Sequence, residues 1–274
     1  MSMIIPEKLA IIAGNGVYPR LLAESARRQG VKNIFTIAFR WETDKIIEKV
    51  SDKTVWIHLG QLDAMLTALK SSGIKTAVMA GQITPTHLFT IRMDTKMISL
   101  LKSLKIRNAE TIFTAVAREL AQIGISLIPA STFMEDYMPG PGILTVRSPT
   151  EPEWNDINIG FKIAKAISNM DIGQTVTVKD GVILSVEAFE GTNEAILRAA
   201  KLGGSGITVV KVAKEGHDMR FDIPVIGTNT IKTLRKAKAA VLAFEAQRAI
   251  ILEKNIVINE ANKFNISICL LYTS

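Results

Sequence analysis

The first half of the chain alternates short β-branched apolar runs with helical patterns, and this alternation most limits the folds that it can adopt. A glycine follows each helical stretch, at Gly30, Gly73 and Gly124, where a helix C-cap is expected. Such alternation is typical of a parallel sheet flanked by helices. We therefore predict a Rossmann-like α/β layer with strands at residues 9–13, 34–38, 54–57, 76–80 and 126–129, and helices at 19–29, 61–71 and 108–123.

Proline and glycine cluster in the middle of the chain, at 139–142 and again at 148–152. We predict the domain boundary there, with an N-terminal domain over 1–138, a linker over 139–152 and a distinct C-terminal α/β domain over 153–268. The second domain should begin with a helix around 153–168. A β-hairpin should follow, in which an Asp180-Gly181 turn joins strands at 175–179 and 182–187. A helix at 192–200, a glycine-rich loop at 203–206 and a strand at 207–212 complete the prediction.

Composition narrows the function classes. The 274 residues can bury a sizeable core, and the formal net charge of +7 favours phosphate-bearing or other anionic partners. Aromatic residues make up 6% and are not interleaved with the basic ones, so nucleic-acid binding has little support. We see neither a membrane-spanning run nor a secretory leader, so we expect a cytoplasmic protein. Peripheral contact with a membrane surface stays open, and a homodimer is expected only because such assemblies are common.

The single cysteine, Cys269, excludes an internal disulfide and a multi-cysteine zinc site. The last six residues, 269–274, can be back-translated to the end of a common transposase-derived sequencing adapter. We therefore hypothesise that these six residues are a non-native tail. An intact genomic copy that continues unchanged through these codons would refute the hypothesis.

The segment 217–224 alternates charged and apolar side chains between Gly216 and Pro224. As a strand it places Asp218, Arg220 and Asp222 on one face, whereas a helix would put the arginine opposite both acids. The segment is also too short for a stable helix, so we predict a strand. Such a row can hold a divalent cation and an anionic oxygen together. The alternative is a surface ion-pair row on an edge strand.

Two glycine turns lie where open α/β sheets bind ligands. Gly14, Asn15 and Gly16 follow the first predicted strand and precede a helix, so their amides could point at an anion. Gly81 and Gln82 follow the fourth strand. A tight structural turn explains either loop equally well. The third glycine of a dinucleotide fingerprint is missing, so dinucleotide binding is disfavoured.

Further candidate substrate-binding residues lie at the ends of the predicted hairpin and in the segments that follow it. Acidic residues here could accept hydroxyl protons or join a metal shell, amides near a glycine could face an anion, and lysines could neutralise a diphosphate. Helix capping and solvated charge are the alternatives. The candidates are Gln174, Glu187, Glu190, Gly191, Thr192, Lys211 and Lys214.

Other catalytic schemes find no support in the sequence. His58, His87 and His217 lack the spacing of metal ligands, and no Gly-x-Ser-x-Gly elbow, Cys/His pair or Walker loop is present. What remains is metal-assisted chemistry on a phosphate anhydride.

The second half of the chain contains three motifs: Asp171-Ile-Gly-Gln-Thr-Val-Thr-Val-Lys-Asp-Gly-Val, Val186-Glu-Ala-Phe-Glu-Gly-Thr192, and Lys211-Val-Ala-Lys with Asp218-Met-Arg-Phe-Asp-Ile-Pro224 and Gly227. Together they closely resemble the LpxI-type UDP-2,3-diacylglucosamine diphosphatases. The N-terminal Ala13-Gly14-Asn15-Gly16 and Gly81 fit the same family, and the resemblance runs from roughly Lys8 to Ile268.

The resemblance implies hydrolysis of the substrate to UMP and 2,3-diacylglucosamine 1-phosphate (lipid X) in lipid A synthesis, by water attack on the β phosphorus and with Mg²⁺ required. It also implies that the lipid-linked sugar nucleotide lies between the two domains. By alignment to the family motif, the essential aspartate falls on Asp222. Mg²⁺ needs only one or two carboxylates, which Asp222 and Asp218 can supply, while Arg220 and Lys211 would offset charge as the bond breaks.

The chain departs from the family pattern at three places. Asn193 stands where the family usually has aspartate, His217 precedes Asp218 where glutamine is usual, and Asn108-Ala109-Glu110 replaces an acidic pair at a helix start. A non-catalytic sugar-nucleotide-binding protein of the same fold is therefore the alternative function.

Overall fold

The computed structural model describes residues 5–83, 93–106, 108–214, 216, 218–221 and 223–272. The chain divides into two compact units, the first over Met1–Met134 and the second over most of the remainder. Residues 218–221 group with the first unit although they lie deep in the second half of the sequence. The boundary between the two units therefore follows Met134, a few residues before the Pro/Gly-rich segment.

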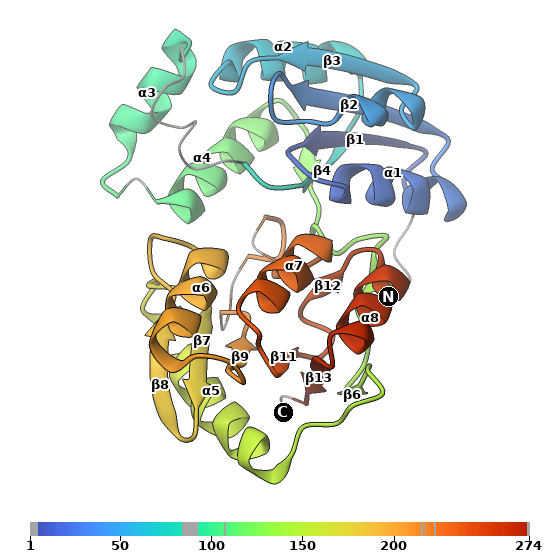
Figure 1. The fold of residues 1–274 in the computed structure, drawn as a ribbon. Helices are drawn as coiled ribbons and strands as arrows, with labels where there is room; N and C mark the ends of the chain where they lie inside the picture. The colour runs from blue at the N-terminus through green and yellow to red at the C-terminus, as the bar shows by residue number, and fades with distance from the viewer. Residues whose placement is uncertain are drawn as a thin grey trace. The chain divides into compact units, whose positions relative to one another are not determined.

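Within its described part, the first unit holds a parallel sheet in the order β3-β2-β1-β4-β5 (Figure 1). From β1 the chain first adds strands on one side, β2 and then β3, and later adds β4 and β5 on the other side. The position between β1 and β4 is therefore a topological switch point. The strands are β1 (Lys8–Ala13), β2 (Asn33–Phe39), β3 (Lys53–Ile57), β4 (Thr76–Ala80) and β5 (Ser126–Leu127), and the helical elements are α1 (Tyr18–Arg28), η1 (Lys45–Lys49), α2 (Leu62–Ser72), α3 (Thr95–Ser103) and α4 (Ala109–Gln122).

The core of the first unit forms because alternate residues of each strand face opposite sides of the sheet. Ile12, Ile37 and Ala77 pack on one side against buried residues of α2, α3 and α4, such as Leu69 and Leu120. Helix α1 contributes its own buried face to the unit. The parallel-sheet layer predicted from the first half is thus confirmed. Helix α3 was not predicted, although Asp94 caps its start by accepting the Met97 N–H at 2.8 Å.

The described residues of the second unit form a mixed six-stranded sheet in the order β6-β13-β11-β9-β7-β8. Strands β9, β11 and β13 are parallel, whereas β7, β8 and β6 add antiparallel edges. The helices and strands of the second unit are η3 (Glu135–Tyr137), β6 (Gly142–Ile143), α5 (Glu151–Asn169), β7 (Thr175–Lys179), β8 (Val182–Val186), α6 (Thr192–Gly203), β9 (Thr208–Lys211), β10 (Val225–Ile226), α7 (Thr228–Lys236), β11 (Val241–Glu245), β12 (Ile250–Ile251), α8 (Lys254–Lys263) and β13 (Ser267–Leu271).

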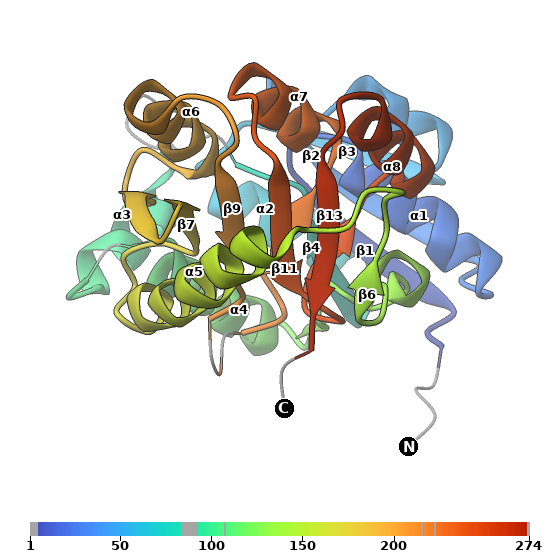
Figure 2. The ribbon, with the colours of Figure 1, turned by 60° about the horizontal axis from the view of Figure 1, so that its bottom comes forward.

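Helices cover both faces of the second sheet. Helix α5 crosses one face, where Ile157 and Ala164 pack against Val178, Val210 and neighbouring strand residues (Figure 2). Helices α6, α7 and α8 pack on the other face. Because buried residues on both faces are apolar, the central strands read as continuous apolar runs. A second α/β unit is therefore confirmed.

The predicted hairpin is present, with Asp180 at φ 51° and Gly181 at φ 80° between β7 and β8. Both residues occupy the left-handed region, as the tight Asp-Gly turn requires.

In the proposed tail, Cys269–Leu271 continue β13, and burial raises the pKa of the Cys269 thiol to about 12. That thiol is therefore not a reactive nucleophile. In the part of the chain that the structure describes, no helix is both long and apolar enough to span a membrane.

Candidate functional site

The two glycine turns of the first unit interlock at the carboxyl ends of β1 and β4. The Gly14 N–H donates to Ala80 O at 2.8 Å, and Asn15 and Gln82 exchange backbone hydrogen bonds at 2.7 and 3.1 Å. A Cβ on Gly14 would lie 2.6 Å from Gln82 O, and one on Gly81, at φ +94°, would lie 2.8 Å from Asn15 O. The structure thus brings these predicted residues together at the switch point. Two of the amides considered for an anion are used in holding the loops.

We predict that Gly14→Ala destabilises the protein by about 1–3 kcal/mol, because the added methyl must push two backbone segments apart. Gly140→Ala is the matched control, since a Cβ there meets nothing within 4 Å. Urea unfolding of the two variants measures the difference. Equal stabilities would show that the close approach of the two turns is not needed for folding.

Four predicted residues of the second unit form one hydrogen-bonded cluster, which we call the Glu187 cluster: Gln174, Glu187, Thr192 and Lys211. The Thr192 hydroxyl donates to Glu187 Oε1 at 2.8 Å, and Lys211 Nζ donates to Thr192 Oγ1 at 3.0 Å. The Gln174 N–H points to Glu187 Oε2 at 3.3 Å. These residues come from the start of β7, the ends of β8 and β9, and the first turn of α6. The cluster therefore places an ammonium group beside a helix N-terminus at one edge of the sheet, which suits a phosphate group.

The remaining predicted residues of this loop have structural partners. Glu190 forms a 2.5 Å ion pair with Arg198, and this hydrogen bond lowers the pKa of the Glu190 carboxyl. Gly191 is the N-cap of α6 at φ +82°. Lys214 Nζ lies 2.5 Å from Asp171 Oδ1. These contacts order the loops around the cluster.

A buried ion pair stands beside the cluster and was not predicted. Glu245, at the end of β11, is 1% exposed; its Oε1 lies 2.9 Å from Lys165 Nζ, and its Oε2 accepts the Ala213 N–H at 2.5 Å. Lys165 Nζ also donates to Ala213 O at 3.0 Å. The pair therefore fixes the backbone that follows β9. An inward-facing acid that ends an apolar strand was the signal in the sequence.

The predicted strand over 217–224 is wrong for the described residues 218–221, which form a turn. The Phe221 N–H donates to Asp218 O at 3.2 Å, and the Arg220 N–H donates to the Asp218 carboxylate at 3.1 Å. Such side-chain-to-backbone bonds compete with strand pairing. The turn is held to the first unit by the Ala130 N–H, which donates to Met219 O at 2.7 Å, and by Phe221 packed on Phe113.

Asp218 and Arg220 meet through this turn rather than through a strand face. Arg220 Nε lies 2.8 and 2.9 Å from the two Asp218 oxygens, Nη2 also contacts the carboxylate, and this hydrogen bonding raises the pKa of the guanidinium. An ion pair, which was the alternative interpretation of this segment, therefore forms between Asp218 and Arg220. Asp222 and His217 lie outside the described residues, so the structure gives no account of them. Among the residues that it does describe, no group of three or more histidine, cysteine, aspartate or glutamate side chains is arranged to hold a metal.

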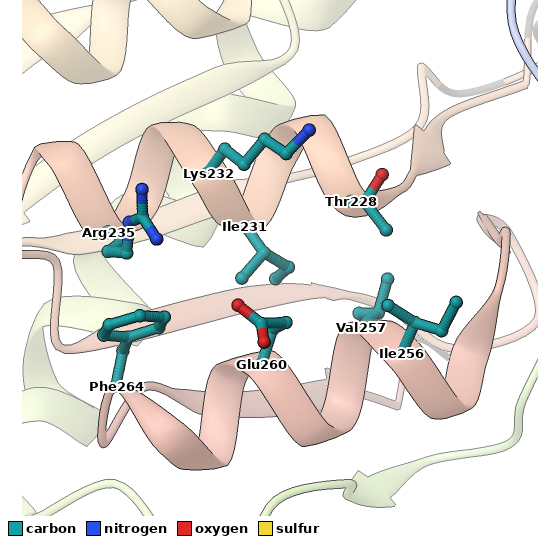
Figure 3. Close-up of a pocket in the computed structure, with 8 residues that line it drawn as sticks. All are labelled: Thr228, Ile231, Lys232, Arg235, Ile256, Val257, Glu260 and Phe264. Atoms are coloured by element: carbon teal, nitrogen blue, oxygen red, sulfur yellow. The ribbon is translucent and has the colours of Figure 1, made fainter.

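A groove of about 280 Å³ lies between α7 and α8 (Figure 3). Ile231 and Val257 form its apolar floor, while Lys232 and Arg235 stand on the α7 side. The Arg235 guanidinium lies 5.0 Å from the centre of the Phe264 ring. No predicted site residue that the structure describes lines the groove.

Comparison with known proteins covers nearly the whole chain. Residues 8–137 match the LpxI N-terminal domain, and residues 140–269 match the LpxI C-terminal domain. The UDP-2,3-diacylglucosamine pyrophosphatase LpxI of Caulobacter vibrioides is 27% identical over 267 residues, which is 93% of this chain and 94% of that protein.

Two solved structures give weak likenesses. The biotin carboxylase domain of Hydrogenobacter thermophilus 2-oxoglutarate carboxylase aligns at TM-score 0.28 and 12% identity, over 66% of this chain and 36% of the other. The N5-carboxyaminoimidazole synthetase of Staphylococcus aureus aligns at TM-score 0.25 and 12% identity, over 62% and 37%. Likenesses this weak carry no argument about function.

Proposed function

This chain belongs to the LpxI family, and from that we propose that it hydrolyses the diphosphate of UDP-2,3-diacylglucosamine to UMP and 2,3-diacylglucosamine 1-phosphate in lipid A synthesis. The observation that carries the proposal is the end-to-end match to both LpxI domains, together with a relative whose name states this substrate. The Glu187 cluster supports it because Lys211 presents a cation where a diphosphate can be bound. A substrate with two acyl chains would bring the protein to the inner membrane surface.

We propose Asp222 and Asp218 as the residues that hold Mg²⁺. Carboxylate oxygens are the donors that this ion prefers, and it needs only one or two of them beside water and substrate oxygens. The donor set therefore fits, although both Asp218 oxygens also accept hydrogen bonds from Arg220. When bound, Mg²⁺ would polarise the diphosphate and lower the pKa of a nearby water.

The chain's own residues would then position the substrate and balance its charge. Lys211, fixed by Thr192, would donate to a diphosphate oxygen and offset the charge that leaves with UMP. Arg220 is held by its bidentate contact with Asp218, so both side chains are oriented before substrate binds. Asp222 would serve as the essential carboxylate.

We predict that Lys211→Met lowers kcat/KM for UMP release by roughly 10- to 100-fold, as expected for the loss of one charge-assisted hydrogen bond. Lys201→Met is a matched control, because Lys201 is an exposed lysine of α6 outside the Glu187 cluster. Steady-state kinetics of both variants gives the comparison. Identical kcat/KM values for wild type and Lys211→Met would remove Lys211 from the site.

The direct test of the function is incubation of the purified protein with UDP-2,3-diacylglucosamine and Mg²⁺, with release of UMP followed by chromatography. The proposal expects catalytic turnover. The alternative, a non-catalytic sugar-nucleotide-binding protein, is favoured by Asn193 in place of the family's usual acid. Tight binding of the substrate without release of UMP in the presence of metal would select that alternative.

A further inference from the structure

Trp41 is an exposed aromatic residue that the core of the first unit does not use. It lies two residues after the end of β2 and is 83% exposed. Its φ of 68° lies in the left-handed region, which is costly for a bulky residue. The backbone at Trp41 therefore keeps an unfavourable conformation, and the indole lies outside the core at the carboxyl edge of the sheet.

The loop that carries Trp41 is fixed to the end of β1. The Thr43 hydroxyl accepts the Phe39 N–H at 2.9 Å and donates to Ala13 O at 2.5 Å. The Thr43 N–H also donates to Phe39 O at 2.9 Å. Ala13 directly precedes the Gly14 turn, so the Trp41 loop is anchored beside the switch point of the sheet.

The His58 ring stands next to Trp41. The two ring centres are 4.8 Å apart and the planes are tilted by 42°. His58 follows β3, and its N–H donates to Gln61 Oε1 at 2.7 Å, which fixes the residue before α2 begins. Because Trp41 is still 83% exposed, the contact with His58 leaves most of the indole open to a second ring.

We propose that Trp41 and His58 form a stacking platform for the uracil ring of the sugar nucleotide. Open α/β sheets of this strand order bind nucleotides at the carboxyl ends of their strands, across the switch point. A rigid, exposed indole gives a nucleobase a large stacking surface at little cost in conformational entropy. The inference rests on the proposed function for the identity of the base, and it assigns that base to the first unit alone.

The test is the binding of UMP to the protein, measured by calorimetry and by tryptophan fluorescence. Trp41→Leu should weaken UMP binding about 5- to 150-fold, the range for losing one stacked base, while Trp41→Phe should keep most of the affinity. Quenching of fluorescence by UMP should vanish in both variants. Trp154→Leu, which removes a less exposed tryptophan from α5, should bind UMP like wild type.

Ribose 5-phosphate is a control ligand that has the sugar and phosphate of UMP but no base. Its binding should therefore not depend on Trp41. In the hydrolysis assay, Trp41→Leu should raise KM and change kcat little. Suppose that the wild type releases UMP and that Trp41→Leu has the same KM and the same UMP affinity as the wild type. This result would overturn the platform and leave the proposed function intact. Trp41-dependent UMP binding without any hydrolysis would overturn the proposed function and support the platform.

Discussion

Asp222→Asn should abolish the release of UMP while the protein stays folded. The substitution keeps the size of the side chain and removes the negative charge that would hold Mg²⁺ or take a proton. We expect a loss of about 1,000-fold or more in kcat, which corresponds to at least about 4 kcal/mol of transition-state stabilisation. Because Asp222 lies outside the described residues, this expectation rests on the match to the family motif.

A matched control for this variant is Asp136→Asn, which removes an exposed carboxylate from η3. The UMP assay and circular dichroism should be run on both variants. Asp218→Asn should have the second-largest effect, and Arg220→Met the third, because each removes the charged contact between the two side chains. Equal turnover by wild type and a well-folded Asp222→Asn protein would contradict the assignment of the essential carboxylate.

Lys165→Met should destabilise the second unit by about 3 kcal/mol or more, because it leaves the Glu245 carboxylate buried without its cation. Urea unfolding gives the free energy, and hydrogen exchange of the β11 amides assigns the loss to this unit. The exposed pair of Lys32 and Glu7 is the control, and Lys32→Met should leave stability unchanged.

The double variant Lys165→Met with Glu245→Gln separates charge from packing. If the buried charge is the cause, neutralising Glu245 should recover much of the stability that Lys165→Met loses. A loss below about 1 kcal/mol in the single variant would mean that water or Arg248, 3.9 Å from Glu245, compensates the charge.

Local signals predicted much of the fold. The β1 and β4 strands were found because each is a short apolar run bounded by turn residues. The hairpin was found because the Asp180-Gly181 turn has a conformation that few other residue pairs adopt. Prediction failed at 218–221, where alternation suggested a strand but the Asp218 carboxylate accepts the Arg220 N–H within a turn.

The candidate site was predictable residue by residue but not as an arrangement. Glu187, Thr192 and Lys211 were selected separately, and only the sheet register shows that they touch. Glu245 pairs with Lys165 across 80 positions, a separation at which periodicity carries no information. Trp41 belongs to no motif, and its exposure can be seen only in the structure.

Hydrolysis in water enriched in ¹⁸O shows directly whether the protein cleaves the diphosphate of UDP-2,3-diacylglucosamine. We expect equal amounts of UMP and 2,3-diacylglucosamine 1-phosphate, with one ¹⁸O atom in the phosphate of the lipid product and none in UMP, because water attacks the β phosphorus. Mass spectrometry of both products measures the label. Formation of UDP with free diacylglucosamine, or the absence of any product with intact substrate and Mg²⁺, would rule out this hydrolysis.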